Sequence, residues 1–510
     1  MGLFEVPQRA GRTQDSTIAK KAKTVAKHTA TVKGGTSLAD KIALAKAMVE
    51  KNLGQYKDKY DVIRQEEMLH DYITECIGNG VISIDTETDG LDPILNHIAG
   101  PCIYTPGQKG VYIPMNHISY ITQTLVPNQL SKEVVNREFQ RFLNKKIDII
   151  MFNSKFDIRV LRNQVGLKDM YCTWDGYLAA RLLNENEPSN ALKKLHQKYV
   201  LNGEADAFTF EELFKGIPFT MIPINTGYLY AARDPEITYE LYEYQRKHLR
   251  LDHEREDLRN VAWVFYNIEM PCVSVVADME DNGVAFDLDY AHELSEKYHK
   301  MLDDAKNEFY QICSEYEPLI NAYKMKNANH KLDTPINIGS PTQLAVLLYD
   351  ILKVESVDRK SPGGTGEPIL SKMDNPIAKA VLNYRTISKL ISTYIDKLPE
   401  CVNPKDGRIH CSFNQYGADT GRMSSSDPNL QNIPSRNHDI RKMFIATQEE
   451  TIVNFDTDEF LEVDKFTEVF INDEWVPVSR FGVGDTIDIF GELFTISNIE
   501  EVNEKVRIYL

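Results

Sequence analysis

The chain has 510 residues, of which 42% are hydrophobic, and a net charge of -17. This hydrophobic content excludes a wholly disordered protein, and the length allows about three or four domains, each with its own core. The seven cysteines are scattered and form no CxxC pair, so neither a disulfide framework nor a zinc site is indicated, and we expect reduced thiols in a cytoplasm. No apolar segment approaches the length of a membrane span, so a membrane partner is not expected.

The net charge would ordinarily argue against a nucleic-acid partner, but the charge is unevenly placed. Sixteen acidic and four basic residues lie in 446–510, so most of the acidity belongs to the C-terminal tail. Residues 1–40 are rich in lysine, threonine and alanine, which predicts a flexible basic arm that cannot fold alone. Such an arm can touch phosphates, although a solvated tail is the more ordinary interpretation.

Helices and strands alternate in the next part of the chain. Helical patterns before residue 81 lead into an apolar run at Val81–Ile84, which is typical of a buried strand. Further strands are predicted at Gly110–Met115 and Ile147–Phe152, and a helix is predicted at Trp174–Asn184. This alternation predicts an α/β domain over 41–250.

Strand signals nearly vanish from Ile268 to Pro399, where long charged amphipathic stretches predict a helical domain. One helix start is marked by Ser340, a typical N-cap, followed by Pro341 at the first helical position. The glycine-rich stretch 361–368 lacks GK[ST] and does not follow a strand, which predicts a flexible loop rather than a phosphate cradle. Short strands punctuated by glycines follow from Glu462 and predict a separate β unit.

Two carboxylates stand at the end of the first apolar run. Asp85 and Glu87 are two residues apart in a predicted strand and therefore face the same side. Their repulsion is tolerable if a divalent cation lies between them, and oxygen ligands suit magnesium or manganese. A DxE pair at a strand end is, by itself, more often the solvated start of a loop.

Three further residues extend this pair. Asp157 lies in the first turns of the helix that follows the Ile147–Phe152 strand, where its carboxylate can reach back toward the strand end. Tyr230 and Asp234 are four residues apart in a stretch that predicts one helix, so a phenol and a fourth carboxylate share a face. Each alone has an ordinary explanation, as a helix-surface aspartate or as a packed tyrosine with its hydroxyl at the rim.

Together, the DxE strand, the aspartate at a strand-helix junction and the later YxxxD resemble the DEDD 3′-5′ exonucleases of the tyrosine subclass. The resemblance spans about residues 65–245 and implies an RNase H-like α/β fold that acts on the 3′ end of a single strand. Two Mg²⁺ or Mn²⁺ ions are implied, with Tyr230 orienting the attacking water and Asn153 and Lys155 nearby. Arg233, inside YxxxD, is not explained. The implied metal ligands are Asp85, Glu87, Asp157 and Asp234, and Asp85 is the ligand expected to bridge the two ions.

The second half of the chain decides between an RNase D-like RNA-processing enzyme and a proofreading domain. It resembles the thumb and first palm segments of family A DNA polymerases, the DNA polymerase I group, in NYRTISKLISTYIDKLP and above all in TGRMSSSDPNLQNIPSR. This resemblance implies a mostly α thumb and a partial α+β palm that bind a primer-template duplex through contacts that position it. The implied DNA-binding residues are Lys389, Ser392, Thr393 and Lys397 in the thumb, and Arg422, Gln431 and Asn432, with Arg436 or Arg441 near the incoming nucleotide, in the palm.

The family pattern breaks at Asp456, which stands where these polymerases have their first metal-binding palm aspartate. No finger-helix motif follows it and no HDE motif supplies the second carboxylate, so this chain alone is not expected to polymerise DNA. Residues 457–510 instead are similar to the first half of a Hint (intein) fold, without the usual Cys or Ser nucleophile at the junction. The simpler alternative is a truncated reading frame that ends in a small β tail.

The sequence therefore predicts a multidomain, phage-like DNA polymerase I fragment. It comprises an exonuclease domain over 41–250, a thumb over 251–400, an incomplete palm over 401–456 and a small all-β tail over 457–510. The expected activity is metal-dependent 3′-5′ proofreading, and a second chain would carry the fingers and the remaining palm. The alternative is a split-intein half or precursor whose main role is association or splicing with that second chain. A catalytically silent DNA-binding scaffold is disfavoured because all five exonuclease groups are present.

Overall fold

The chain divides into two compact units, Met1–Ser274 and Val275–Leu510. A computed structural model describes residues 37–204, 208–328, 331–418 and 421–446, together with strands between 460 and 509. Most of the predicted basic arm, residues 1–36, lies outside the described residues. The seven cysteines, all in the described part, are free thiols. No described helix combines the length and the apolar character that crossing a membrane requires.

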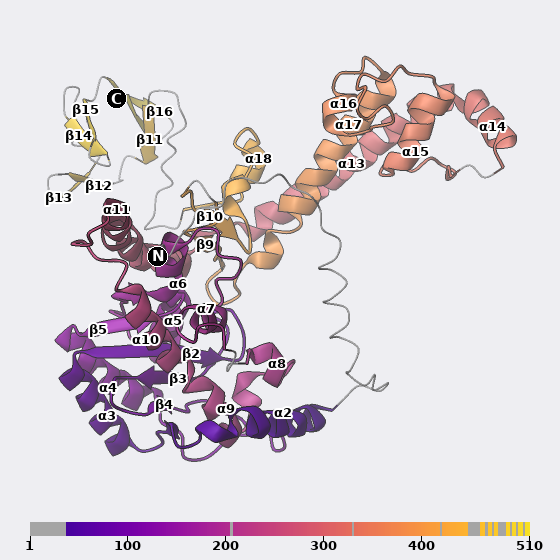
Figure 1. Cartoon of the computed structure of the whole chain (residues 1–510). Helices are drawn as coiled ribbons and strands as arrows, with labels where there is room; N and C mark the ends of the chain where they lie inside the picture. Colours follow the sequence, from indigo (N-terminus) through magenta and orange to yellow (C-terminus); the bar gives the residue numbers. More distant parts are fainter. Residues whose placement is uncertain are drawn as a thin grey trace. The chain divides into compact units, whose positions relative to one another are not determined.

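The first unit is built on a six-stranded sheet with the order β1-β4-β3-β2-β5-β6 (Figure 1). Its strands are β1 Tyr60–Val62, β2 Val81–Thr88, β3 Ile98–Tyr104, β4 Gly110–Tyr112, β5 Asp148–Met151 and β6 Trp174–Asp175. β2 lies inside the sheet, antiparallel to β3 and parallel to β5, and its residues Ile82 and Ile84 are buried. Because β2 is paired on both sides, it is a rigid support for the side chains at its end.

The three strands predicted in this unit are confirmed as β2, β4 and β5. β2 is longer than the apolar run because it continues through Thr88. β3 was not predicted, since its sequence contains Gly100 and Pro101, which usually mark loops. Gly100 is needed there because a Cβ would come 2.1 Å from Ile113 O, so the sheet tolerates no side chain at this position.

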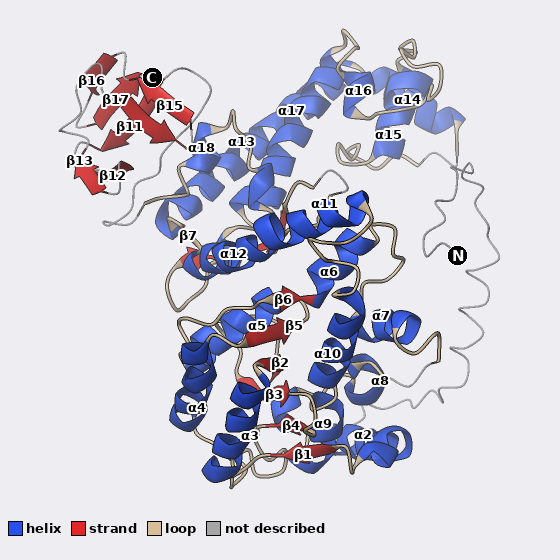
Figure 2. Ribbon diagram, turned by 60° about the vertical axis from the view of Figure 1, so that its left-hand side comes forward, coloured by secondary structure: helices blue, strands red, loops and turns tan. Residues whose placement is uncertain are grey.

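Helices cover both faces of the sheet, with α3 and α4 on one face and α10 on the other (Figure 2). The helices of this unit are α2 Leu38–Leu53, α3 Glu66–Asn79, α4 Lys132–Lys145, α5 Ser154–Val160, α6 Gly176–Leu183, α7 Leu192–Tyr199, α8 Phe210–Phe214, α9 Ile224–Ala231, α10 Asp234–Gln245 and α11 Glu256–Val264. α2 and α3 confirm the helical patterns predicted before residue 81. The helix predicted from Trp174 begins at Gly176, because Trp174 and Asp175 form β6.

The single helix predicted to carry both Tyr230 and Asp234 is wrong. α9 ends at Ala231, and α10 begins at Asp234. Pro235 explains the break, because proline has no N-H to donate and its ring clashes with the carbonyl four residues earlier, that of Ala231. Tyr230 and Asp234 therefore come from two consecutive helices rather than from one helix face.

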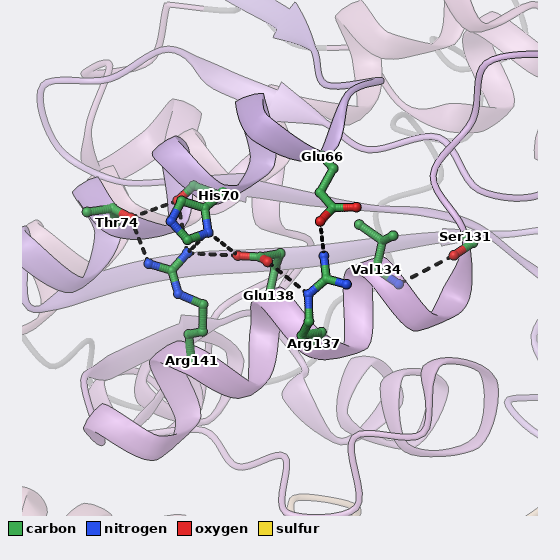
Figure 3. A network of polar contacts seen from close by, with 8 residues as sticks. All are labelled: Glu66, His70, Thr74, Ser131, Val134, Arg137, Glu138 and Arg141. Atoms are coloured by element: carbon green, nitrogen blue, oxygen red, sulfur yellow. Dashed lines mark hydrogen bonds and ion pairs between the residues drawn. The ribbon is translucent and has the colours of Figure 1, made fainter.

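A buried carboxylate joins α3 to α4 (Figure 3). The Glu138 side chain is 4% exposed and accepts hydrogen bonds from Arg137 Nε at 3.3 Å and Arg141 Nη1 at 2.7 Å. Burial raises the pKa of this carboxyl, but the hydrogen bonds from Arg141 and Arg137 outweigh burial and hold the pKa below its ordinary value. Arg141 also donates to His70 O of α3 at 3.0 Å. The buried charge thus ties together the two helices that cover one face of the sheet.

Replacing Glu138 by glutamine is expected to lower the free energy of unfolding at pH 7 by about 2 kcal/mol, because two arginines lose a charged partner. Since the folded-state pKa lies below the unfolded one, this stabilisation is complete above the unfolded pKa of about 4.3 and disappears as the pH falls through the folded pKa. Glu66→Gln is the control, because Glu66 pairs with Arg137 on the surface and is expected to contribute less than about 1 kcal/mol. Urea unfolding at pH 7 measures both, and equal losses would contradict the prediction.

The second unit is mostly helical up to residue 446. Its helices are α13 Leu288–Glu315, α14 Glu317–Lys326, α15 Pro341–Ala345, α16 Glu367–Leu370, α17 Pro376–Leu390 and α18 His438–Arg441, and α12 Met270–Asn282 spans the boundary between the units. α13 packs along α17 (Figure 1), and one buried cluster includes Phe309 while another includes Tyr394. The described strands of this region are β7 Val284–Ala285, β8 Arg408–Ile409, β9 Ser412–Asn414 and β10 Ser424–Ser426.

Local predictions in the second unit are confirmed. The stretch from Ile268 to Pro399 is helical apart from β7 and connecting loops among its described residues. Ser340 caps α15, since its hydroxyl accepts a hydrogen bond from Gln343 N at 3.4 Å. The glycine-rich stretch 361–368 is a loop until α16 begins at Glu367.

Beyond residue 459 the described chain forms short antiparallel strands, as the sequence predicts. They are β11 Phe460–Asp464, β12 Glu468–Ile471, β13 Glu474–Pro477, β14 Thr486–Ile489, β15 Glu492–Thr495, β16 Asn498–Val502 and β17 Lys505–Tyr509. β17 pairs with β11 and β16, β12 pairs with β13, and β14 pairs with β15. The resemblance of this tail to a Hint fold stays a prediction.

Candidate metal centre

The carboxylate end of β2 presents the first two predicted ligands. Asp85 and Glu87 alternate with Thr86 along the strand, so they point to one face and Thr86 to the other. Cys102 lies directly opposite Asp85 on β3. Ligand atoms of Asp85, Glu87 and Cys102 all lie within 4.8 Å of one another, which is close enough for one ion to contact all three.

Asp157 is brought to this strand end by the turn between β5 and α5. Asn153 precedes α5 in a left-handed conformation with φ 58°. Buried Asp175 holds the turn, because it accepts hydrogen bonds from Asn153 N at 3.1 Å and from Ser154 N at 2.7 Å. Thr86 Oγ1 then donates to Asp157 Oδ1 at 2.6 Å. The first turn of α5 is thereby fixed against β2, as predicted for Asp157.

The break between α9 and α10 places Tyr230 and Asp234 beside one another through a shared partner. Lys193 Nζ on α7 lies 3.0 Å from the Asp234 carboxylate and 3.7 Å from the centroid of the Tyr230 ring. The Tyr230 ring also packs against Phe214, with centroids 5.6 Å apart. Asp234 itself is 8% exposed, so neighbouring groups rather than bulk water surround its carboxylate.

The four carboxylates affect one another electrostatically. Burial raises the pKa of Asp85 well above its ordinary value, and the charges of Asp157, Asp234 and Glu87 raise it further. Burial likewise raises the pKa of Glu87, with Asp234 as its strongest charged neighbour, and raises the pKa of Asp157 to about 7. Burial and the charge of Asp234 also raise the pKa of Tyr230, so its phenol stays protonated. These groups fit one or two hard divalent cations, which would neutralise a cluster of buried oxygen ligands.

Several residues of this centre were not predicted from the sequence. Thr86, Cys102, Asp175 and Lys193 contact or surround the carboxylates, yet none stands in a recognisable motif. Their proximity depends on strand pairing and helix packing rather than on local pattern. Arg233, left unexplained by the sequence, is buried with its guanidinium 4.5 Å from the centroid of the Tyr56 ring. A guanidinium stacked on a ring in this way contributes to packing near α2.

In the second unit, the predicted DNA-binding residues of the helical region share an exposed face. Lys389 at the end of α17, and Ser392, Thr393 and Lys397 beyond it, are exposed, whereas the intervening Tyr394 is buried. Lys397 is paired with Glu400 at 2.7 Å on the surface. The face is therefore open to solvent and polar.

The remaining predicted DNA-binding residues lie in the segment around β10 and α18. Arg422, Gln431, Asn432 and Arg436 are exposed, while Arg441 in α18 is half-buried. Tyr394 Oη donates to Asn432 O at 2.6 Å, which ties the turn at Gln431 and Asn432 to the exposed face that begins at Lys389. Asp456, the predicted polymerase-site ligand, lies outside the described residues.

Known proteins resemble both halves of the chain. Residues 60–250 match the 3′-5′ exonuclease family, and residues 290–460 match DNA polymerase family A. The chain is 32% identical over 401 residues to DNA polymerase I of Chloroflexus aurantiacus, covering 76% of this chain and 39% of that protein. It is 30% identical over 406 residues to DNA polymerase I of Pseudomonas aeruginosa, covering 76% of this chain and 41% of that protein.

A solved structure has a similar fold. It is the POL domain of Pol1 from M. smegmatis in complex with DNA primer-template and dNTP, with a TM-score of 0.54, 20% identity, and coverage of 79% of this chain and 60% of that chain. At this identity the likeness concerns the fold alone. The chain spans about two-fifths of the length of the two curated relatives. By its two family matches, the chain contains a 3′-5′ exonuclease region and a DNA polymerase family A region.

Proposed function

We propose that the chain removes nucleotides from DNA 3′ ends as a metal-dependent proofreading exonuclease. The observation that carries this proposal is the convergence of four mutually repelling carboxylates, with a protonated tyrosine among them, at one end of β2. Such a cluster is costly in a folded protein unless cations neutralise it. Phosphodiester hydrolysis needs cations of this kind beside the developing negative charge.

The side chains of this centre have different proposed roles. Asp85, Glu87, Asp157 and Asp234 would hold two Mg²⁺ or Mn²⁺ ions, which when bound supply an activated water and stabilise the departing 3′ oxygen. Tyr230 keeps its proton and can hydrogen-bond the attacking water, which orients it toward the phosphorus. Asn153, exposed at the start of α5, and Lys155 in its first turn would contact the terminal nucleotides. A frayed single strand is the preferred substrate because its end is free of stacking.

The direct test uses the whole chain and a single-stranded DNA with a label on its 5′ end. With Mg²⁺ or Mn²⁺, products that shorten one nucleotide at a time are expected, and EDTA is expected to stop the reaction. A strand labelled at its 3′ end should release the label in the first product. Products that keep the 3′ label, or a reaction unaffected by EDTA, would contradict the proposal.

We further propose that the second unit binds a primer-template duplex. The exposed polar face from Lys389 to Lys397, tied to the turn at Gln431 and Asn432, supports this role. Side chains of this kind position the phosphate backbone without reading sequence. Nucleotide addition is not proposed for residues 1–510, because their sequence holds no second palm carboxylate motif after Asp456.

Lys389→Ala is expected to weaken binding of a primer-template duplex several-fold and to lower the slope of log affinity against log salt by about 1, since one phosphate contact is lost. Lys379→Ala is the matched control, because Lys379 is an exposed lysine on the same helix, α17, paired with Asp374. Fluorescence anisotropy at several salt concentrations measures both variants. An unchanged salt slope for Lys389→Ala would remove this residue from the proposed surface.

A second candidate function concerns the tail, which we propose as a split-intein or precursor element. The match to DNA polymerase family A ends at residue 460, where a run of short antiparallel strands begins. These two observations favour a unit distinct from the polymerase region. Intact-mass measurement of the chain co-expressed with the product of its downstream gene tests this idea. A ligated product lacking the tail is expected, and unchanged masses for both chains would defeat it.

A further inference from the structure

One lysine reaches into the carboxylate cluster. Lys193 lies in α7, and its side chain is 12% exposed, which is uncommon for a lysine. Its ammonium lies 3.0 Å from the Asp234 carboxylate and 3.7 Å from the centroid of the Tyr230 ring. The next residue, Lys194, is exposed. Of two adjacent lysines, one is therefore enclosed by the candidate metal centre and the other faces solvent.

The charge of Lys193 acts on more than its direct partner. It also favours the ionised forms of Asp85 and Glu87, lowering the pKa of each against the effect of burial. The face of Tyr230 adds a cation-π contact that keeps the ammonium charged and close by. In the absence of metal ions, this lysine thus offsets part of the negative charge of the cluster.

We propose that Lys193 is a built-in cation that competes with the divalent metal for Asp234 and, once displaced, positions the DNA by contacting its backbone phosphate. This inference rests on the proposed exonuclease function. Lys193 Nζ lies 3.0 Å from each oxygen of the Asp234 carboxylate. A divalent cation bound at Asp234 would repel this nearby ammonium and weaken its ion pair. The Tyr230 ring lies 3.7 Å from the ammonium and can keep it in the site when its pairing with Asp234 weakens.

Two opposite changes follow for Lys193→Met, which removes the charge and keeps a long apolar side chain. Mn²⁺ should bind about tenfold more tightly, because a competing positive charge has left a cluster of four carboxylates. The KM for DNA should rise several-fold at saturating Mn²⁺, because a phosphate contact has been lost. A lysine with a merely structural role would loosen the site, and both Mn²⁺ and DNA would then bind more weakly.

The experiment measures Mn²⁺ binding by electron paramagnetic resonance on the whole chain without DNA, and separately measures the kinetics of degradation. Lys193→Arg should return both values toward those of the wild type, and Lys194→Met should leave both unchanged. Weaker or unchanged Mn²⁺ binding by Lys193→Met would overturn the proposal. If Mn²⁺ binding tightens as expected but the wild type degrades no DNA, the proposed nuclease function fails while the competition between Lys193 and the metal stands.

Discussion

Replacing Asp85 and Glu87 together by alanine is expected to reduce 3′-end degradation of single-stranded DNA by about 10³-fold or more. Both carboxylates point from the end of β2 into one site, where their ligand atoms lie within 4.8 Å of each other. Without them, the cations that activate the water and stabilise the leaving oxygen lose their central ligands. Asp157 and Asp234 would remain, but they approach from α5 and α10 rather than from β2.

This double variant should remain folded. It removes two half-buried, mutually repelling carboxylates, so its melting temperature in EDTA should equal or exceed that of the wild type. The matched control is Asp71→Ala with Glu75→Ala, which also removes two carboxylates, but from the exposed side of α3. Its activity should stay within about twofold of the wild type. Undiminished degradation by the Asp85 and Glu87 variant would refute the assignment of the metal centre.

The stabilisation of the chain by Mn²⁺ is expected to grow strongly between pH 5.5 and pH 8. Asp157 has a pKa of about 7 in the folded chain without metal, against an ordinary value of 3.8, and the pKa values of Asp85 and Glu87 are also raised. The folded state therefore binds more protons than the unfolded state in this range, so stability without metal falls as the pH rises. Metal ions replace these protons, and their stabilising effect should be largest where the carboxylates would otherwise be ionised and unpaired.

Thermal unfolding of the whole chain in EDTA and in Mn²⁺, across this pH range, measures the effect. The increase in melting temperature caused by Mn²⁺ should be several degrees larger at pH 8 than at pH 5.5 for a unit of this size. In the Asp85→Ala, Glu87→Ala variant the difference between the two pH values should largely vanish. A constant Mn²⁺ effect at both pH values in the wild type would show that the carboxylates are not the groups that bind the ion.

Motif order and local pattern were sufficient for much of the fold and for the five central groups of the site. β2 begins with an apolar run, and the DxE spacing places two carboxylates on one face whatever the strand pairs with. The helical character of the second unit likewise follows from amphipathic patterns that are read locally. β3 was missed because Gly100 and Pro101 are loop signals that its position within the sheet overrides. The prediction of one helix across Tyr230 and Asp234 is wrong because Pro235 interrupts the helix.

The sequence alone predicted the four carboxylates and the tyrosine of the candidate site. Strand alternation places Asp85 and Glu87 on one face, and the resemblance to DEDD exonucleases supplies the complete set. Tertiary structure alone decided that Lys193 would join them from α7, that Cys102 would lie opposite Asp85, and that Asp175 would hold the turn before Asp157. It also raised the pKa values of these carboxyl groups, since burial and carboxylates from distant parts of the sequence disfavour their ionised forms. The physical reason is that contacts and desolvation depend on which segments pack together in space. Local sequence patterns do not show which distant segments will pack together.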